Sequence, residues 1–169
     1  MEEVARLLNE MLEAGVILDY AVFEAVAQMR YTEAVATLDA DILVDIPGPD
    51  SSGVLTGVYS FCQQRGYPPR GEAVLVGEWP VQFIPAFSHL TQEAMREAEI
   101  AELGSVTVRV VRADYLAVIA LSVGRAKDLA RVLALREAGA VSDGAIAELA
   151  LRHGLLAEWQ RFGERFHDS

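Results

Sequence analysis

An acidic pair placed directly before an apolar run is the feature that most constrains how this chain folds. Asp39 and Asp41 lead into the apolar residues 42–44, and a Pro-Gly-Pro turn at residues 47–49 stops the segment. A short apolar run bounded by turn residues predicts a buried β-strand over residues 37–45. Because alternate side chains of a strand share a face, we expect both acids to point to the same side near the start of this strand.

Two carboxylates on one face of a strand suggest a metal site. Such a pair can hold one hard cation, such as Mg²⁺, at oxygen distances of about 2.0–2.1 Å. The acid-x-acid triplet alone favours a different interpretation, two solvated acids at the end of a strand. The rest of the chain has to show whether the metal site is the better interpretation.

Length and charge limit the classes of function. A chain of 169 residues suits one domain with room for a small helical appendage. The net charge of −11 argues against a general affinity for phosphate backbones. The charge is uneven, −12 over residues 1–104 and +1 over residues 105–169, so a polyanionic ligand would need the arginines of the second half or a cation bound by the first.

The sequence lacks the features of a membrane or secreted protein. The chain has no apolar run of about eighteen residues that would span a bilayer, and its acidic start lacks a signal-peptide pattern. Its one cysteine, Cys62, has no partner for an internal disulfide. We therefore expect a cytoplasmic protein with no membrane partner. His89, His153 and His167 are scattered without the spacing of a metal cluster, which predicts surface or capping roles for them.

Apolar periodicity predicts an α+β fold. Expected helices cover residues 4–14, 20–29, 51–65, 91–99 (with Thr91 as N-cap), 115–123, 127–138, 142–152 and 155–166. Besides the strand over residues 37–45, expected strands cover residues 73–76, 81–84 and 106–110, with a hairpin joining the second and third of the four. This order predicts a small mixed sheet covered by helices in residues 1–112. A helical part over residues 113–169 would then pack on this core as one compact unit.

Four segments, in their order along the chain, resemble a known family. They are residues 31–44 (Tyr-Thr-Glu-Ala-Val-Ala-Thr-Leu-Asp-Ala-Asp-Ile-Leu-Val), 81–85 (Val-Gln-Phe-Ile-Pro), 90–94 (Leu-Thr-Gln-Glu-Ala) and 124–128 (Gly-Arg-Ala-Lys-Asp). Together they resemble the minimal nucleotidyltransferases of the DNA polymerase β superfamily, above all the AbiEii/AbiGii toxin-like proteins. The resemblance covers roughly residues 15–135. It implies the small mixed sheet of the nucleotidyltransferase fold.

The resemblance implies a metal-assisted transfer of a nucleoside monophosphate from a nucleoside triphosphate to a hydroxyl acceptor in RNA, in a protein or in a small molecule. In this interpretation Asp39 and Asp41 are catalytic and bind Mg²⁺ or Mn²⁺, with Gln82 as a weak third ligand. Lys127 would be both catalytic and nucleotide-binding, and Arg125 and Thr37 would also bind the nucleotide.

The charged residues around position 127 also have a structural interpretation. A solvated helix start with local ion pairs is equally typical of Arg125, Lys127 and Asp128. In either case we expect Asp128 to orient a neighbouring basic side chain rather than to bind a metal.

Two positions depart from the pattern of the family. A Gly-Gly or Gly-Ser pair is expected where this chain has Phe23-Glu24, and a third carboxylate where it has Gln82. Phenylalanine adds bulk in a phosphate cradle, Glu24 would repel a triphosphate, and an amide cannot act as a general base. These changes predict weak or absent triphosphate binding. The alternative function is therefore a catalytically impaired relative that binds a nucleotide or a protein partner, such as a cognate antitoxin in a toxin–antitoxin system.

Overall fold

The computed structural model describes residues 1–48 and 53–166, and in this part of the chain seven strands form one mixed sheet. The strands are β1 (Asp19–Phe23), β2 (Ala40–Asp45), β3 (Pro69–Arg70), β4 (Ala73–Val76), β5 (Trp79–Pro85), β6 (Glu99–Leu103) and β7 (Val106–Val110). The helices are α1 (Glu2–Glu13), α2 (Glu24–Gln28), α3 (Thr56–Gln64), α4 (His89–Arg96), α5 (Ala113–Val123), α6 (Ala126–Glu137), α7 (Asp143–Arg152) and α8 (Leu156–Phe166).

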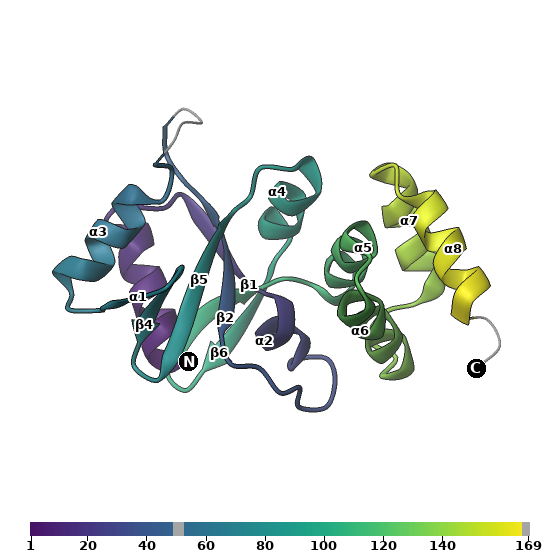
Figure 1. Ribbon diagram of the computed structural model, residues 1–169, viewed down its shortest axis with the longest axis horizontal. Coiled ribbons are helices and arrows are strands. Elements are labelled where there is room, and N and C mark those ends of the chain that lie inside the picture. Colours follow the sequence, from purple (N-terminus) through teal and green to yellow (C-terminus); the bar gives the residue numbers. More distant parts are fainter. Residues whose placement is uncertain (49–52, 167–169) are drawn as a thin grey trace.

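The acidic strand β2 lies at the centre of the sheet, whose order is β3-β4-β5-β2-β1-β7-β6. It pairs parallel with β5 and antiparallel with β1. Figure 1 shows α1 and α3 on one side of the sheet and α2 and α4 on the other. Because both faces are covered, the consecutive residues Ile42, Leu43 and Val44 are all buried. The apolar run therefore gives a fully buried strand, as the sequence predicts.

The four C-terminal helices follow the last strand and extend the second side of the sheet (Figure 1). Helix α5 is buried almost all round, because α4 and the helices α6, α7 and α8 pack against it. The predicted fold class, a mixed sheet with covering helices followed by a helical segment, is confirmed. The division into residues 1–112 and 113–169 remains a prediction.

The structure corrects the predicted elements at three places. The expected helix over residues 20–29 is instead strand β1 followed by the short helix α2, because the apolar run in β1 lies between β2 and β7 in the sheet. Strand β6 was missed, and residue 99 begins it rather than ending α4. The N-cap of α4 is Ser88, whose hydroxyl accepts a hydrogen bond from the Thr91 N–H. Ser51 or Ser52, which the sequence predicts as the N-cap of the helix over residues 51–65, lies outside the described residues.

No helix in the described ranges is both long and apolar enough to cross a bilayer.

Two leucines of similar sequence context provide a test of the central strand. Leu43 is 0% exposed, whereas Leu38, five residues earlier, is 90% exposed. Leu43→Ala should lower the free energy of unfolding by about 2–5 kcal/mol, because it leaves a cavity in the core. Leu38→Ala should change it by less than about 0.5 kcal/mol. Urea unfolding of both variants measures the two values, and equal values would contradict this placement of β2.

Candidate functional site

The two acids of the predicted metal site lie where β2 begins. Asp39 precedes the strand and Asp41 is its second residue, and both are partly buried. The Thr37 hydroxyl donates hydrogen bonds to the Asp39 backbone carbonyl (2.9 Å) and to its carboxylate (3.3 Å). Thr37, predicted to bind nucleotide, thus braces the turn that presents Asp39.

Charges of both signs surround the carboxylate of Asp41. Burial raises the pKa of Asp41 to about 6, and the negative charges of Asp39 and Glu24 add to this shift. The positive charges of Lys127 and Arg131 oppose it. Helix α6, which carries both cations, therefore faces the start of β2, although about ninety residues of sequence separate the two elements.

Strand pairing places Gln82 directly beside the acidic pair. The parallel register of β2 and β5 aligns Gln82 with Asp41, and Gln82 is partly exposed. Asp45 is exposed at the far end of β2, four residues and about 13 Å along the strand from Asp41. Gln82 thus occupies the position beside the acids, and Asp45 lies too far away to replace a third carboxylate.

The Phe23-Glu24 pair lies at the junction of β1 and α2, next to Asp41. Phe23 pairs with Asp41 across the strands and is buried in the hydrophobic core, so its side chain contributes to packing. Glu24 has a left-handed backbone, with φ of +52°. Glycine adopts this conformation without strain, whereas other residues pay about 1–2 kcal/mol. The backbone at this position thus has the shape that suits the glycine expected from the family resemblance.

The side chain of Glu24 makes an ion pair with Arg131, which is 8% exposed. Arg131 also donates a hydrogen bond from Nε to the Gln28 side chain, at 3.1 Å. A carboxylate thus contacts a buried guanidinium beside the acidic pair. The sequence analysis predicted that Glu24 repels phosphate, but it did not single out Arg131. Only the tertiary packing of α2 against the C-terminal helices reveals this partner.

The helix start at residues 124–128 contains a local ion pair. The buried carboxylate of Asp128 accepts hydrogen bonds from the backbone N–H of Arg125 (3.2 Å) and from its guanidinium Nε (2.7 Å) and Nη2 (3.2 Å). Asp128 orients a basic side chain, as the sequence predicted. The guanidinium of Arg125 is thus already paired, whereas Lys127 is exposed and acts electrostatically on Asp41.

The acidic pair provides hard oxygen ligands that fit a divalent cation. Asp39 and Asp41 offer carboxylate oxygens and Gln82 offers an amide oxygen, which are the ligands that Mg²⁺ and Mn²⁺ prefer. The raised pKa of Asp41 arises from burial and from neighbouring carboxylates, and a bound cation would relieve both effects. The residues present are therefore compatible with a metal ion at this end of the sheet.

A concavity of about 830 Å³ lies at the opposite end of β2. Its lining includes Val44, Asp45, Pro85 and Phe87, and neither Asp39 nor Asp41 contributes to it. The acidic pair and this concavity are thus separate features of the sheet.

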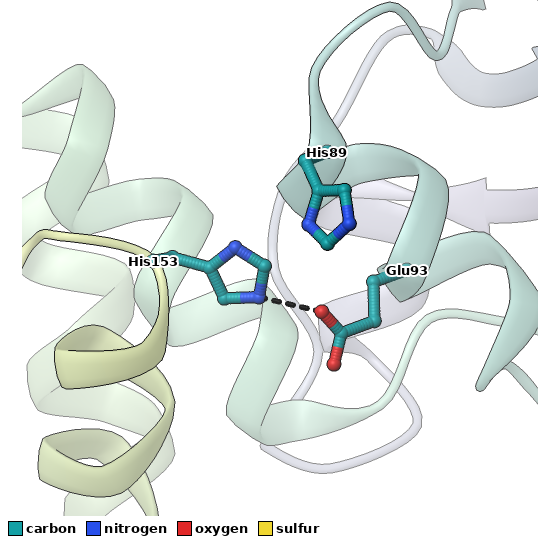
Figure 2. Close-up of side chains that lie close together, drawn as sticks. All are labelled: His89, Glu93 and His153. Atoms are coloured by element: carbon teal, nitrogen blue, oxygen red, sulfur yellow. Dashed lines mark ion pairs between the residues drawn. The ribbon is translucent and has the colours of Figure 1, made fainter.

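A second group of metal-ligating side chains, which the sequence analysis missed, lies in a different part of the fold. His89, Glu93 and His153 place one ligand atom each within 4.8 Å of one another (Figure 2). The prediction that the histidines are scattered is therefore wrong for His89 and His153. They are 64 positions apart in the sequence, and only the packing of α7 near α4 brings them together. The four-residue spacing of His89 and Glu93 was the available signal, but the helix predicted from the sequence began at residue 91 and left His89 out.

Comparison with known structures identifies the fold. No family profile matches the chain, and no curated protein matches its sequence. The antibiotic-resistance factor ANT(2'')-Ia matches 99% of this chain and 97% of its own length, with a TM-score of 0.54 and 13% sequence identity. An antigenic nucleotidyltransferase-like protein from Paracoccidioides brasiliensis matches 99% and 98%, with a TM-score of 0.50 and 11% identity.

The chain has the nucleotidyltransferase fold. At such low identity the likeness concerns the fold alone, so activity and substrate remain to be argued from the site. The narrower resemblance to AbiEii/AbiGii toxin-like proteins stays a prediction.

The raised pKa of Asp41 predicts how stability depends on pH in metal-free buffer. The folded protein holds this proton up to about pH 6, whereas the unfolded chain releases it near pH 3.8. The stability associated with protonated Asp41 is thus present below about pH 4 and lost as the pH rises through about 6. With allowance for partial exposure, Asp41→Asn should be about 1–2 kcal/mol more stable than the wild type at pH 8.

Urea unfolding of the wild type and Asp41→Asn between pH 4 and pH 8 measures this difference. Asp45→Asn, at the exposed end of the same strand, is the control and should show no such change with pH. A constant difference between wild type and Asp41→Asn across the range would contradict the crowded electrostatic setting of Asp41.

Proposed function

We propose that this protein is a metal-dependent nucleotidyltransferase that moves a nucleoside monophosphate from a nucleoside triphosphate to a hydroxyl acceptor. One observation carries the proposal: Asp41 lies beside a second acid, Asp39, and within the electrostatic reach of Lys127 and Arg131. Acids that suit a cation, facing basic side chains that suit phosphates, are the two halves of a site for a metal–triphosphate complex. The fold adds support, because the acids lie at the start of a central strand in a sheet of the nucleotidyltransferase fold.

Each side chain has a distinct role in the proposed reaction. Asp39 and Asp41 would hold the metal ion, with the amide oxygen of Gln82 as a weaker third ligand. The bound ion would neutralise the phosphates and favour in-line attack. Lys127, exposed and flexible, would contact the triphosphate as a point charge. Because the amide of Gln82 cannot accept a proton, the acceptor hydroxyl lacks a general base on β5, and we expect slow turnover.

A second function is favoured by the Glu24–Arg131 ion pair. The carboxylate of Glu24 pairs with Arg131, which would otherwise be available to bind a phosphate. It also adds negative charge beside Asp41. A protein of this kind could bind a nucleotide or a protein partner without catalysing transfer. Separate measurements of binding and of turnover distinguish the two functions.

Substitution of the acidic pair tests the proposed activity. The chain is incubated with labelled nucleoside triphosphates, Mg²⁺ and a mixture of RNA, protein and small hydroxyl acceptors. Asp39→Asn and Asp41→Asn should each lower transfer by about 100-fold or more, because each removes charge stabilisation from the reacting phosphates. Asp45→Asn should keep the wild-type rate, since Asp45 lies at the far end of β2.

Calorimetry with the magnesium–triphosphate complex measures binding in the same variants. Binding without turnover would favour the second function. The absence of both at millimolar ligand in the wild type would rule out the proposed enzyme.

Glu24→Gln tests whether the Glu24 carboxylate limits triphosphate binding. The substitution keeps the size of the side chain and removes one negative charge near the phosphates. We expect the magnesium–triphosphate complex to bind about tenfold more tightly, as one charge near a partly buried site is worth about 1–2 kcal/mol. Glu137→Gln, exposed at the end of α6, removes the same charge elsewhere and is the matched control. Equal or weaker binding by Glu24→Gln would show that Glu24 does not oppose the ligand.

A further inference from the structure

The group formed by His89, Glu93 and His153 lies well away from the acidic pair. Helix α4 follows the carboxyl end of β5, whereas Gln82 and Asp41 lie near the other end of the paired strands. Figure 1 accordingly shows α4 at the opposite end of the sheet from the loop that leads into β2. Nothing in the proposed transfer reaction uses these three residues, so they require an explanation of their own.

Helical geometry brings two of the three side chains together. The hydrogen bond between the Ser88 hydroxyl and the Thr91 N–H starts α4, so that His89 is its first residue. Glu93 follows four residues later and therefore lies on the same face, one turn along. His153 comes from the end of α7, where it is the C-cap residue. Figure 2 shows the three side chains converging from these two helices.

The distances suit a single metal ion. One ligand atom from each residue lies within 4.8 Å of the other two. Atoms that each lie about 2.0–2.2 Å from one zinc ion are at most about 4.4 Å apart. His89 is exposed, so its side chain has room to adjust by the few tenths of an ångström that remain. The backbone therefore already places all three ligands within reach of one ion.

The imidazole of His153 supplies an independent indication of a ligand. Its side chain is 7% exposed, and its Nε2 atom is buried without a hydrogen bond to any residue that the structure describes. The Glu93 Oε2 atom lies 2.7 Å away, so the imidazole has an ion-pair partner there only when the ring is protonated. A buried polar atom without a hydrogen bond costs about 1–3 kcal/mol. A metal ion between the nitrogen and the carboxylate would remove that cost.

The carboxylate of Glu93 is held in place from its other side. Its Oε1 atom accepts a hydrogen bond from the Tyr115 hydroxyl at 2.8 Å and lies 2.8 Å from Nη2 of Arg152. These contacts leave Oε2 directed to His153. Partners that orient a ligating carboxylate in this way are typical of metal sites. Because Arg152 contacts Oε1, it need not move when Oε2 binds a cation.

We propose that His89, Glu93 and His153 form a binding site for a zinc-like divalent transition metal ion. Two imidazole nitrogens and one carboxylate oxygen are a ligand set that zinc prefers, and magnesium, which favours oxygen ligands, does not. Three protein ligands leave one position of a tetrahedral ion open for water or for a further group.

The bound ion would join α4, which packs on the central sheet, to α7 in the C-terminal helical segment. It would thus fasten the helical segment to the sheet and stabilise the folded chain. The proposal is independent of the transferase proposal, because none of its residues belongs to the acidic pair.

Zinc binding by the full chain, purified without a histidine tag, tests the site. Calorimetry at pH 7.5 should detect one Zn²⁺ site per chain that persists in Asp41→Asn, in which the acidic pair has lost one carboxylate. The midpoint of thermal unfolding should rise with zinc, fall back with a chelator and show no comparable rise with Mg²⁺. Absence of saturable zinc binding in the wild type would overturn the proposal.

Single substitutions locate the ion. His89→Ala changes an exposed residue and should leave folding intact, yet weaken zinc binding by about 100-fold or more, since even residues that only orient ligands contribute 10–100-fold. His153→Ala and Glu93→Gln should do the same, with far-UV circular dichroism confirming that each is folded. Glu148→Gln, exposed on α7, and Asp41→Asn, in the acidic pair, should bind zinc as the wild type does. Unchanged zinc binding in His89→Ala and His153→Ala would place the ion elsewhere and refute the site.

Discussion

Burial of β2 between β1 and β5 is the constraint on which the candidate site depends. The core of this strand is apolar on both faces, so its position in the sheet leaves little freedom for slippage. Asp39 and Asp41 lie at the strand start, where the sheet meets α2 and the C-terminal helices, whereas Asp45 lies exposed at the far end. The same burial that stabilises the fold therefore forces two carboxylates into a confined space. A cluster of like charges in such a place is costly, which marks it as a candidate functional site.

The elements predicted correctly from the sequence are those with an unambiguous local signal. The α5–α8 segment has helical periodicity with glycine stops, and the β4–β5 hairpin has two short β runs around a tight turn. Strand β1 was mistaken for a helix because its residues Tyr20–Phe23 are continuously apolar and alanine follows, a pattern that also suits a buried helix. Strand β6 was missed because its exposed edge carries Glu99 and Glu102, which interrupt any apolar pattern. Pairing with β7, rather than local preference, makes this segment a strand.

The residues of the candidate site also fall into those with a local signal in the sequence and those without one. Asp39, Asp41 and Gln82 were found from the sequence because strand alternation and the order of four segments are local or sequential signals. Arg131 was not singled out, since its contact with Glu24 depends on how α6 packs against α2. The convergence of His89 and His153 likewise depends on the packing of two distant helices, which no spacing rule reveals. Sequence patterns thus predict ligands on one element and miss those that tertiary packing assembles.

Glu24 combines a strained backbone with an ion pair to a nearly buried arginine. Its left-handed backbone costs about 1–2 kcal/mol that glycine would not pay. In return its carboxylate pairs with Arg131, which is nearly buried, and removal of one partner from a buried ion pair typically costs about 3–5 kcal/mol. That cost measures the charge left unpaired in Arg131 and not the net worth of the ion pair, so the pair does not by itself make Glu24 stabilising. Under the proposed function, the same carboxylate adds negative charge beside Asp41, and any gain in triphosphate affinity on its removal would come with an unpaired Arg131.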